Sequence, residues 1–336
     1  MPTPAVRRQI EERLEDLQQR HLPEEPGSVA SYYASGRGYY APELAGSERD
    51  EFAVCGATVD GEVFCAGDRE VRFPLQSISK VFAYALALAD RGSDAVLERV
   101  GVEPSGDAFN SIVFDERHHR PYNPMVNAGA LVTSDLVLGR DPDEKLDRLV
   151  AALRCYSGDA GLQPDAETFE LELATADHNR ASAYLMRNLR MLEGDVEAIL
   201  ALYLRQCSVH VDARDLAVMA ATLANGGVNP LTGERALPRA RVRDVLSVMH
   251  TCGMYDYAGQ WAFEVGVPAK SGVSGGILAV IPGKIGLGVF SRGLDDYGNS
   301  VRGVRVCKEI SERLGLHVFA TETEDAMLRL TAPSEP

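Results

Sequence analysis

The sequence predicts an α+β fold, with a mixed or antiparallel sheet that is flanked by terminal helices and joined to an all-helical lobe. Strand-like hairpins occur near the start of the chain and again after residue 259, whereas the patterns from about residue 90 to 260 are almost all helical. The most economical assembly of these hairpins is one shared sheet. The expected sheet lobe comprises about 25–75 and 260–318, and the expected helical lobe about 76–259.

Local patterns place the individual elements. Apolar residues at helical spacing make 1–24 an N-terminal amphipathic helix, which Pro23 and Pro26 end. Further helices are expected at 196–204, 216–223 and 301–314. The expected strands are 52–57, 62–66, 265–272, 276–281 and 285–290, with turns at Asp60-Gly61 and Pro282-Gly283. The acidic tail, 321–336, is expected to be frayed.

Composition limits the classes of function. The chain has 336 residues, of which 45% are hydrophobic, and a net charge of −15, which argues against nucleic acid or an anionic membrane as a partner. No stretch approaches the apolar length of a membrane span, and the start of the chain leads into a charged helix rather than a signal sequence. Cytoplasmic localisation is therefore expected. The six cysteines lack metal-finger spacing and are expected to be reduced and mostly buried.

Segment 73–80 precedes an uncharged run, rich in Ala and Leu, that predicts a helix buried on nearly all sides. Ser77 and Lys80 are one helical turn apart, so the hydroxyl and the amine share a face. Burial would depress the pKa of Lys80 toward the neutral form, which can take a proton from a serine nucleophile. The alternative for Ser77 is a plain helix N-cap, because Ser-x-x-Lys alone is a common motif.

A second motif, late in the chain, favours the catalytic interpretation. Lys270-Ser271-Gly272 ends an expected strand, where the lysine could keep Lys80 neutral by like-charge repulsion and could orient a hydroxyl. The backbone amides of Ser77 and Val273 could form an oxyanion hole. Ser-x-x-Lys followed by Lys-Ser-Gly, around a helical block, is the arrangement of serine β-lactamases and penicillin-binding proteins, and it predicts serine acyl transfer.

Longer blocks resemble those of the bacterial-type, serine-dependent glutaminases. These blocks are 76–80, 103–106, 123–130, 219–227, 250–256 and 268–276, and the resemblance extends from about residue 32 to 314. It implies a β-lactamase-like fold, a single glutaminase catalytic domain at 25–320, and hydrolysis of L-glutamine to L-glutamate and ammonia without a cofactor or metal. It also implies a γ-glutamyl acyl-enzyme on Ser77, with Lys80 and Tyr255 as proton-transfer groups.

The resemblance assigns the remaining site residues by position. The catalytic residues are expected to be Ser77, Lys80 and Tyr255, with support from Lys270, Ser271 and Gly272. The substrate-binding residues are expected to be Tyr40, Ser77, Asn127, Glu172, Asn179, Tyr203, Tyr255 and Val273. Glu172 suits the α-ammonium of glutamine, whereas neutral amide and phenol groups suit its carboxylate. The loop around Tyr40 departs from the family pattern, because Ala41 replaces the usual isoleucine, and Tyr39 is the alternative tyrosine.

Other interpretations stay open at this point. A β-lactamase or D-Ala-D-Ala peptidase would share the serine–lysine chemistry, and a glutamine sensor would not need a nucleophile. Without the family, Tyr203 is a core residue, Glu172 part of a solvated face and Asn179 a turn residue. His118-His119 looks like a metal pair, but adjacent histidines in such a charged loop usually face solvent. The expected partners are L-glutamine and further copies of the chain, as a dimer or tetramer by analogy with relatives.

Overall fold

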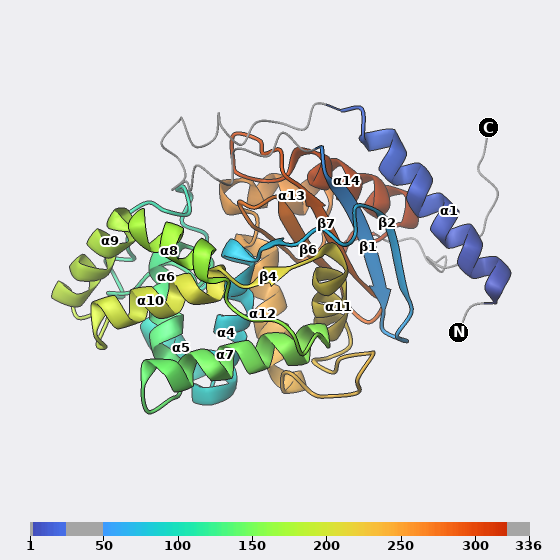
Figure 1. Cartoon of the computed structure of the whole chain (residues 1–336). Coiled ribbons are helices and arrows are strands. Elements are labelled where there is room, and N and C mark those ends of the chain that lie inside the picture. The colour runs from blue at the N-terminus through green and yellow to red at the C-terminus, as the bar shows by residue number, and fades with distance from the viewer. Residues whose placement is uncertain (1–2, 25–49, 321–336) are drawn as a thin grey trace.

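The structure is a computed structural model that describes residues 3–24 and 50–320. Figure 1 shows its two parts side by side: a sheet with helices on both faces, and a group of helices next to it. The segment that bears Ser77 runs between these two parts, because it leaves a short strand and enters the first helix of the helical group.

The sheet is antiparallel throughout. Its five strands are β1 (Phe52–Thr58), β2 (Val63–Gly67), β5 (Ala269–Ser271), β6 (Gly276–Ile281) and β7 (Ile285–Ser291), in the order β2-β1-β7-β6-β5. The early hairpin pairs with the late one through β1 and β7, with Phe52 opposite Ser291 and Thr58 opposite Ile285. The predicted α+β fold with one shared sheet is therefore confirmed.

Side chains alternate between the two faces of the sheet, and each face packs against different helices. Phe52 and Val54 belong to a core shared with three helices: α1 (Pro4–His21), α13 (Ala258–Glu264) and α14 (Val301–Leu314). Ala53 and Cys55 point the other way, into the larger core that contains α11 (Ala213–Ala224) and most of the helical group. In Figure 1, α1 and α14 lie on one side of the sheet and α11 on the other.

The close approach of α11 to the sheet depends on two glycines of β7. A Cβ atom at Gly286 would lie 2.1 Å from the backbone nitrogen of Ala221, and one at Gly288 would lie 2.1 Å from the carbonyl oxygen of Ala213. No side chain fits at such distances. The alanine-rich face of α11 therefore packs directly on the strand backbone, which buries the helix between the sheet and the helical group.

The helical group consists of eight helices of the described residues. They are α4 (Ser79–Arg91), α5 (Ser93–Arg99), α6 (Asn127–Leu136), α7 (Pro142–Ser157), α8 (Ala166–Ala174), α9 (Asp177–Asn188), α10 (Val196–Cys207) and α12 (Arg239–Cys252). A two-stranded sheet that the sequence did not predict, β3 (Phe73–Pro74) with β4 (His210–Val211), joins the chain before α4 to the chain after α10. It anchors the segment that leads to Ser77.

One expected strand is shorter than predicted, since only Ala269–Ser271 of 265–272 forms β5. The backbone N–H groups of Val265 and Gly266 instead donate to the carbonyl oxygen of Trp261, at 2.8 and 3.0 Å. Gly266 also adopts a left-handed φ of 68°, as is common after a helix C-terminus. The preceding helix α13 therefore determines the conformation of residues whose alternating pattern is typical of a strand.

The expectation that all six cysteines are reduced is wrong for one pair. Cys55 and Cys65 form a disulfide. They lie directly opposite each other on β1 and β2, with their Cα atoms 4.1 Å apart, so both side chains extend from the same face of the hairpin. This pairing depends on the strand register, which cysteine spacing does not reveal. Cys155, Cys207, Cys252 and Cys307 are free.

Candidate active site

Ser77 lies in a tight turn that immediately precedes a buried helix. The turn is the 3₁₀ segment η1 (Gln76–Ile78), and α4 begins only at Ser79. Ile78 occupies the cap position of α4, and no side chain caps that helix, so the N-cap alternative for Ser77 is wrong. The Ser77 hydroxyl is thus left for other interactions. The backbone before it is unusual, because Gln76 adopts a φ of 49°, in a region that non-glycine residues rarely occupy.

Lys80 makes the hydrogen bonds that define the site. Its side chain is completely buried, and its Nζ atom lies 3.1 Å from Ser77 Oγ and 2.6 Å from Asn127 Oδ1. Lys80 forms no ion pair with any residue that the structure describes. Burial therefore lowers its pKa to about 8, although the nearby Cys207 thiol acts in the opposite direction. A substantial fraction of Lys80 is thus neutral near physiological pH and can accept a proton.

Lys270 and Tyr255 meet at one backbone carbonyl, that of Ser271. The Nζ atom of Lys270 donates to this oxygen at 2.6 Å and the Tyr255 hydroxyl donates to it at 3.0 Å. Burial, followed by the charge of Lys80, holds the pKa of Lys270 well below its usual range. The charge of Lys80 thus disfavours a charge on Lys270, whereas burial alone lowers the pKa of Lys80.

Tyr255 belongs to η2 (Tyr255–Tyr257) and is a second strained position, with a φ of 58°. Its ring lies 4.5 Å from that of Phe109, measured between centroids, and Val273 packs against the same small cluster. Burial raises the pKa of the Tyr255 hydroxyl, and a hydrogen bond with Ser77 offsets part of that rise. The hydroxyl is therefore a proton donor near the serine rather than a phenolate.

Three neutral polar side chains line the side of Lys80 away from the sheet. Asn127, at the start of α6, donates to Asn179 Oδ1 at 2.9 Å. The Tyr203 hydroxyl of α10 donates to Asn127 Oδ1 at 3.3 Å. All three are at most 6% exposed, and burial raises the pKa of Tyr203, which keeps its hydroxyl protonated. Residues far apart in the sequence thus form one hydrogen-bonded network around Lys80.

Glu172 of α8 also belongs to the site, through a residue to which sequence reasoning assigned no role. Gln76 donates to Glu172 Oε1 at 2.6 Å. Burial raises the pKa of Glu172, and this hydrogen bond opposes the rise. Gln76 stands directly before Ser77 in the motif. The only hint in the sequence that Gln76 has a function is that this polar residue occupies a turn expected to be buried. Cys207 and Phe109 both lie near Lys80, and nothing in the sequence indicated that they belong to the site.

The Lys-Ser-Gly strand passes directly behind the serine turn. A Cβ atom at Gly272 would lie 3.2 Å from the carbonyl oxygen of Leu75, so the strand and the turn approach closely. The Ser271 side chain is buried, and its Oγ atom has no hydrogen-bond partner among the residues that the structure describes. Tyr40 and its alternative Tyr39 lie outside the described residues. Every other expected site residue lies in one of the contacts described above.

The adjacent histidines belong to no cluster of metal-ligating side chains among the described residues. His118 Nδ1 lies 2.6 Å from Asp115 Oδ2, a local contact within an exposed loop. Within 3–24 and 50–320, no group of three or more His, Cys, Asp or Glu side chains could hold a metal ion. Over the same ranges, no helix is long and apolar enough to cross a membrane.

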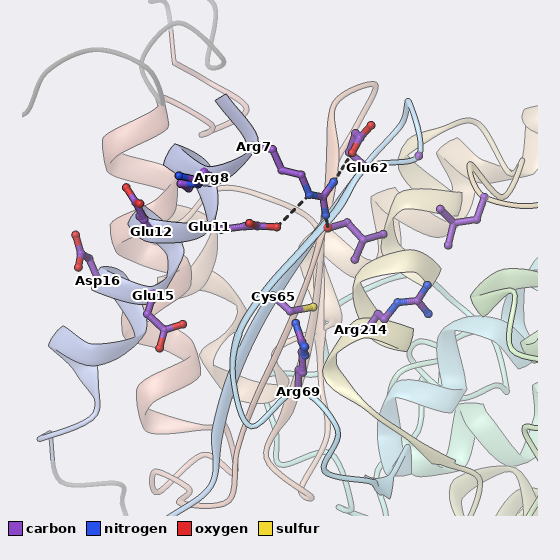
Figure 2. A pocket seen from close by; sticks show the side chains of 13 residues that line it. Arg7, Arg8, Glu11, Glu12, Glu15, Asp16, Glu62, Cys65, Arg69 and Arg214 are labelled. Atoms are coloured by element: carbon purple, nitrogen blue, oxygen red, sulfur yellow. Dashed lines mark hydrogen bonds and ion pairs between the residues drawn. The ribbon is translucent and has the colours of Figure 1, made fainter. Parts of the chain in front are cut away.

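A separate hollow, of about 920 Å³, lies between α1 and the edge strand β2. Figure 2 shows Arg7 at one end of this hollow, where it contacts Glu11 at 3.1 Å and Glu62 at 2.6 Å. Arg7 also donates to the carbonyl oxygen of Val63 at 2.8 Å. These contacts attach α1 to the hairpin, and no residue of the serine–lysine network lines this hollow.

Comparison with known proteins agrees with this geometry. The family model described as Glutaminase matches residues 37–319. The chain belongs to the glutaminase family. It is 52% identical to a glutaminase of Trichormus variabilis over 306 residues, which cover 91% of this chain and 89% of that one. It is 45% identical to a glutaminase of Clostridium tetani over 295 residues, which cover 87% of this chain and 94% of the relative.

Solved structures of similar proteins share the fold. The probable glutaminase ybaS superposes with a TM-score of 0.87 at 37% identity, covering 95% of this chain and 99% of that one. The protein Mglu in its glutamate form superposes with a TM-score of 0.85 at 42% identity, covering 96% of this chain and 72% of that one. The resemblance to glutaminases and the β-lactamase-like fold are therefore confirmed. As a family member the chain is an enzyme of the glutaminase class, which hydrolyses glutamine to glutamate.

Proposed function

We propose that this glutaminase-family enzyme hydrolyses the side-chain amide of L-glutamine through a γ-glutamyl ester on Ser77. The observation that carries the proposal is the 3.1 Å contact between Lys80 Nζ and Ser77 Oγ. The amine is wholly buried and has a pKa lowered to about 8, so it can act as the base that a serine nucleophile needs.

The first half of the reaction forms the ester. Neutral Lys80 takes the proton of Ser77 as Oγ attacks the δ-carbon of glutamine, while the amides of Ser77 and Val273 hold the developing oxyanion. The proton on Lys80 then passes, by way of the Tyr255 hydroxyl, to the amide nitrogen. The carbon–nitrogen bond breaks, and ammonia leaves.

The second half hydrolyses the ester. Water attacks the same carbon and gives a proton to the Lys80–Tyr255 pair. The bond to Ser77 Oγ then breaks, and Ser77 recovers its proton as glutamate is released. Each proton taken is returned, so no oxidant, reductant or cofactor is consumed. In both halves the Ser271 carbonyl oxygen holds the Tyr255 hydroxyl, while Lys270 lies over the Tyr255 ring.

Substrate recognition uses the charges at the two ends of glutamine. Glu172 is the one carboxylate within the described network, and we assign the α-ammonium to it. The amide and phenol groups of Asn127, Asn179 and Tyr203 can donate to the α-carboxylate. Tyr40 is assigned to the same end by resemblance alone. An anion opposite neutral donors suits a small zwitterion better than the acylated ring of a β-lactam.

Ammonia release tests the proposal. Ammonia release is measured with L-glutamine, L-asparagine and D-glutamine, and hydrolysis of a chromogenic cephalosporin is followed by its colour change. The variants are Ser77→Ala and, as a matched control two residues away, Ser79→Ala. We expect turnover of L-glutamine that Ser77→Ala abolishes and Ser79→Ala retains. Mass spectrometry of acid-quenched wild type should show a γ-glutamyl adduct that is absent from Ser77→Ala.

Each alternative has its own outcome in this experiment. Cephalosporin turnover without glutaminase activity would indicate a β-lactamase or peptidase. Glutamine binding without turnover would indicate a sensor. Activity retained by Ser77→Ala would contradict the acyl-enzyme. Cytoplasmic localisation and a dimeric or tetrameric assembly also remain proposals, which cell fractionation and light scattering of the purified protein test.

A further inference from the structure

Asn127 is the residue at which the hydrogen bonds around Lys80 converge. Its Nδ2 group donates to Asn179 Oδ1 at 2.9 Å, and its Oδ1 atom accepts from Lys80 Nζ at 2.6 Å and from the Tyr203 hydroxyl at 3.3 Å. These partners belong to α9, α4 and α10, and all three helices contact α6, which begins at Asn127. A carboxamide has two N–H donors and two acceptor positions, so three of the four are occupied.

The backbone holds Asn127 in place independently of its side chain. The N–H group of Asn127 donates to the carbonyl oxygen of Phe109 at 2.9 Å. Just before it, the Asn123 side-chain oxygen accepts the backbone N–H of Val126 at 3.2 Å. A Cβ atom at Gly129 would lie 1.9 Å from the carbonyl oxygen of Asn123, so the first turn of α6 packs directly on this loop. The position of Asn127 is therefore built into the fold.

The orientation of the Asn127 carboxamide decides whether Lys80 can act as a base. A neutral amine has two N–H groups and one lone pair. With Oδ1 facing Nζ, Lys80 donates one N–H to it, and the lone pair is left for the Ser77 hydroxyl, whose oxygen lies 3.1 Å away. A carboxamide turned by 180° would instead place an N–H group on that lone pair. Asn179 favours the first orientation, because its Oδ1 atom accepts from Asn127 Nδ2.

The carboxamide also gives Lys80 an acceptor that carries no charge. The titratable groups near Lys80 and Ser77 come from four elements and are Cys207 and Tyr203 of α10, Tyr255 of η2, Lys270 of β5 and Glu172 of α8. Burial raises the pKa of the thiol and of both phenols, so these groups stay neutral. Glu172 accepts from Gln76, and no carboxylate of the described residues pairs with Lys80.

We propose that Asn127 positions Lys80 for catalysis, since its oxygen, oriented by Asn179 and Tyr203, accepts one N–H of the amine and leaves the lone pair to Ser77. This inference rests on the proposed function, in which Lys80 is the base for Ser77. It adds to the assignment of Asn127 to the substrate carboxylate, because the fourth hydrogen-bonding position, one N–H of Nδ2, is still free to donate to glutamine.

Replacing Asn127 by Asp tests this role with a side chain of the same shape. A carboxylate 2.6 Å from Nζ would form a buried ion pair, which raises the pKa of Lys80. We expect the acid limb of kcat/KM for L-glutamine to move up by about one pH unit or more, and activity lost near pH 7.5, about tenfold, to return at higher pH. Asn188→Asp, exposed at the end of α9, adds the same charge and should leave the limb unchanged. An unmoved limb in Asn127→Asp would overturn the proposal.

Urea unfolding at several pH values gives a second test that involves no substrate. Above about pH 8 the wild-type protein should become more stable as pH rises, because the unfolded chain still binds a proton at Lys80 and the folded chain does not. The ion pair in Asn127→Asp would keep Lys80 protonated in the folded state, so this rise should disappear. A role of Asn127 confined to substrate binding would leave the rise intact, and that result would contradict the proposal.

A double-mutant cycle tests whether Asn179 acts through Asn127. Asn179→Leu and Asn127→Ala should each lower kcat at saturating glutamine about tenfold or more, and the double variant should be no slower than Asn127→Ala. Fully multiplicative losses would show that Asn179 acts independently and would overturn its part in the proposal. Failure of the proposed function is distinct, because it would appear without these variants, as activity retained by Ser77→Ala or as a wild-type acid limb far from pH 8.

Discussion

Lys270 holds its Nζ atom 4.1 Å from the centroid of the Tyr255 ring, and both side chains donate to the Ser271 carbonyl oxygen. This oxygen therefore fixes a phenol and an amine that come from different elements. Lys270 therefore contacts the ring of Tyr255 and shares the acceptor of its hydroxyl, which suits a residue that positions Tyr255. Tyr255 needs such support because its φ of 58° is unfavourable for a tyrosine.

Replacing Lys270 by Met tests this positioning role. Methionine keeps the length and the apolar contacts but cannot donate to Ser271 or place an amine over the Tyr255 ring, so Tyr255 loses that contact. We expect kcat to fall roughly 10- to 100-fold, as for a weakened proton-transfer group, with KM changed less than about twofold. Lys284→Met, on an exposed turn, is the control. An unchanged kcat in folded Lys270→Met would show that Lys270 only fills space.

The pKa of Lys80 predicts the pH dependence of the reaction. Because Lys80 must be neutral to accept a proton, kcat/KM should rise with pH and level off above about 8. A pH–rate profile with L-glutamine measures this acid limb. If the apparent pKa of this acid limb lies well below 7, the base is a group other than Lys80.

The same pKa predicts how stability depends on pH. Between about pH 8 and the usual lysine pKa of 10.5, the unfolded chain binds a proton at Lys80 that the folded chain does not. The unfolding free energy should therefore gain a positive contribution as pH rises through this window. Urea titrations of wild type and Lys80→Met at several pH values should show that the contribution is absent from the variant.

Glu172→Gln tests the assignment of the substrate ammonium. Removing the carboxylate should raise KM for L-glutamine roughly 10- to 100-fold, because a charge-assisted hydrogen bond is lost. Glutaramate, which lacks the α-ammonium, is the matched substrate. Wild type should strongly prefer glutamine over glutaramate, and the variant should lose most of that preference. If the preference persists, another group binds the ammonium.

Reduction of the Cys55–Cys65 disulfide should destabilise the β1–β2 hairpin. Closing a loop of this length stabilises a protein by about 2–3 kcal/mol in the chain-entropy description. Urea unfolding with and without dithiothreitol should show this difference, and the double variant Cys55→Ala/Cys65→Ala should show no response to reductant. Alkylation under denaturing conditions should label only four of the six cysteines. Labelling of all six would restore the expectation of reduced cysteines.

Gly288→Ala tests the packing of α11 on β7. The added Cβ atom would meet the Ala213 carbonyl oxygen at 2.1 Å, so helix and strand must separate. We expect a loss of about 2–3 kcal/mol in unfolding free energy, as for overpacked cores. Gly259→Ala is the control, since nothing lies within 4 Å of its added atom. A Gly288→Ala protein as stable as wild type would contradict the close approach.

The sequence by itself determined what depends on neighbouring residues. The three-residue spacing of Ser77 and Lys80 brings the hydroxyl and amine together through a single turn, and the turns at Asp60-Gly61 and Pro282-Gly283 predict both hairpins. The long blocks shared with glutaminases also identified the family without any knowledge of the structure. These signals are local, because turn geometry and side-chain spacing follow from the backbone alone.

Only the tertiary structure decided which distant groups meet. Gln76 and Glu172 are 96 residues apart, and the sequence around one of them does not indicate contact with the other. The disulfide depends on the register of two strands, and the support of Tyr255 by Lys270 depends on how η2 packs against β5. Burial also decides whether Lys80 can act as a base. A lysine becomes a base only when its surroundings exclude water and supply no carboxylate. The spacing of residues along the chain does not specify those surroundings.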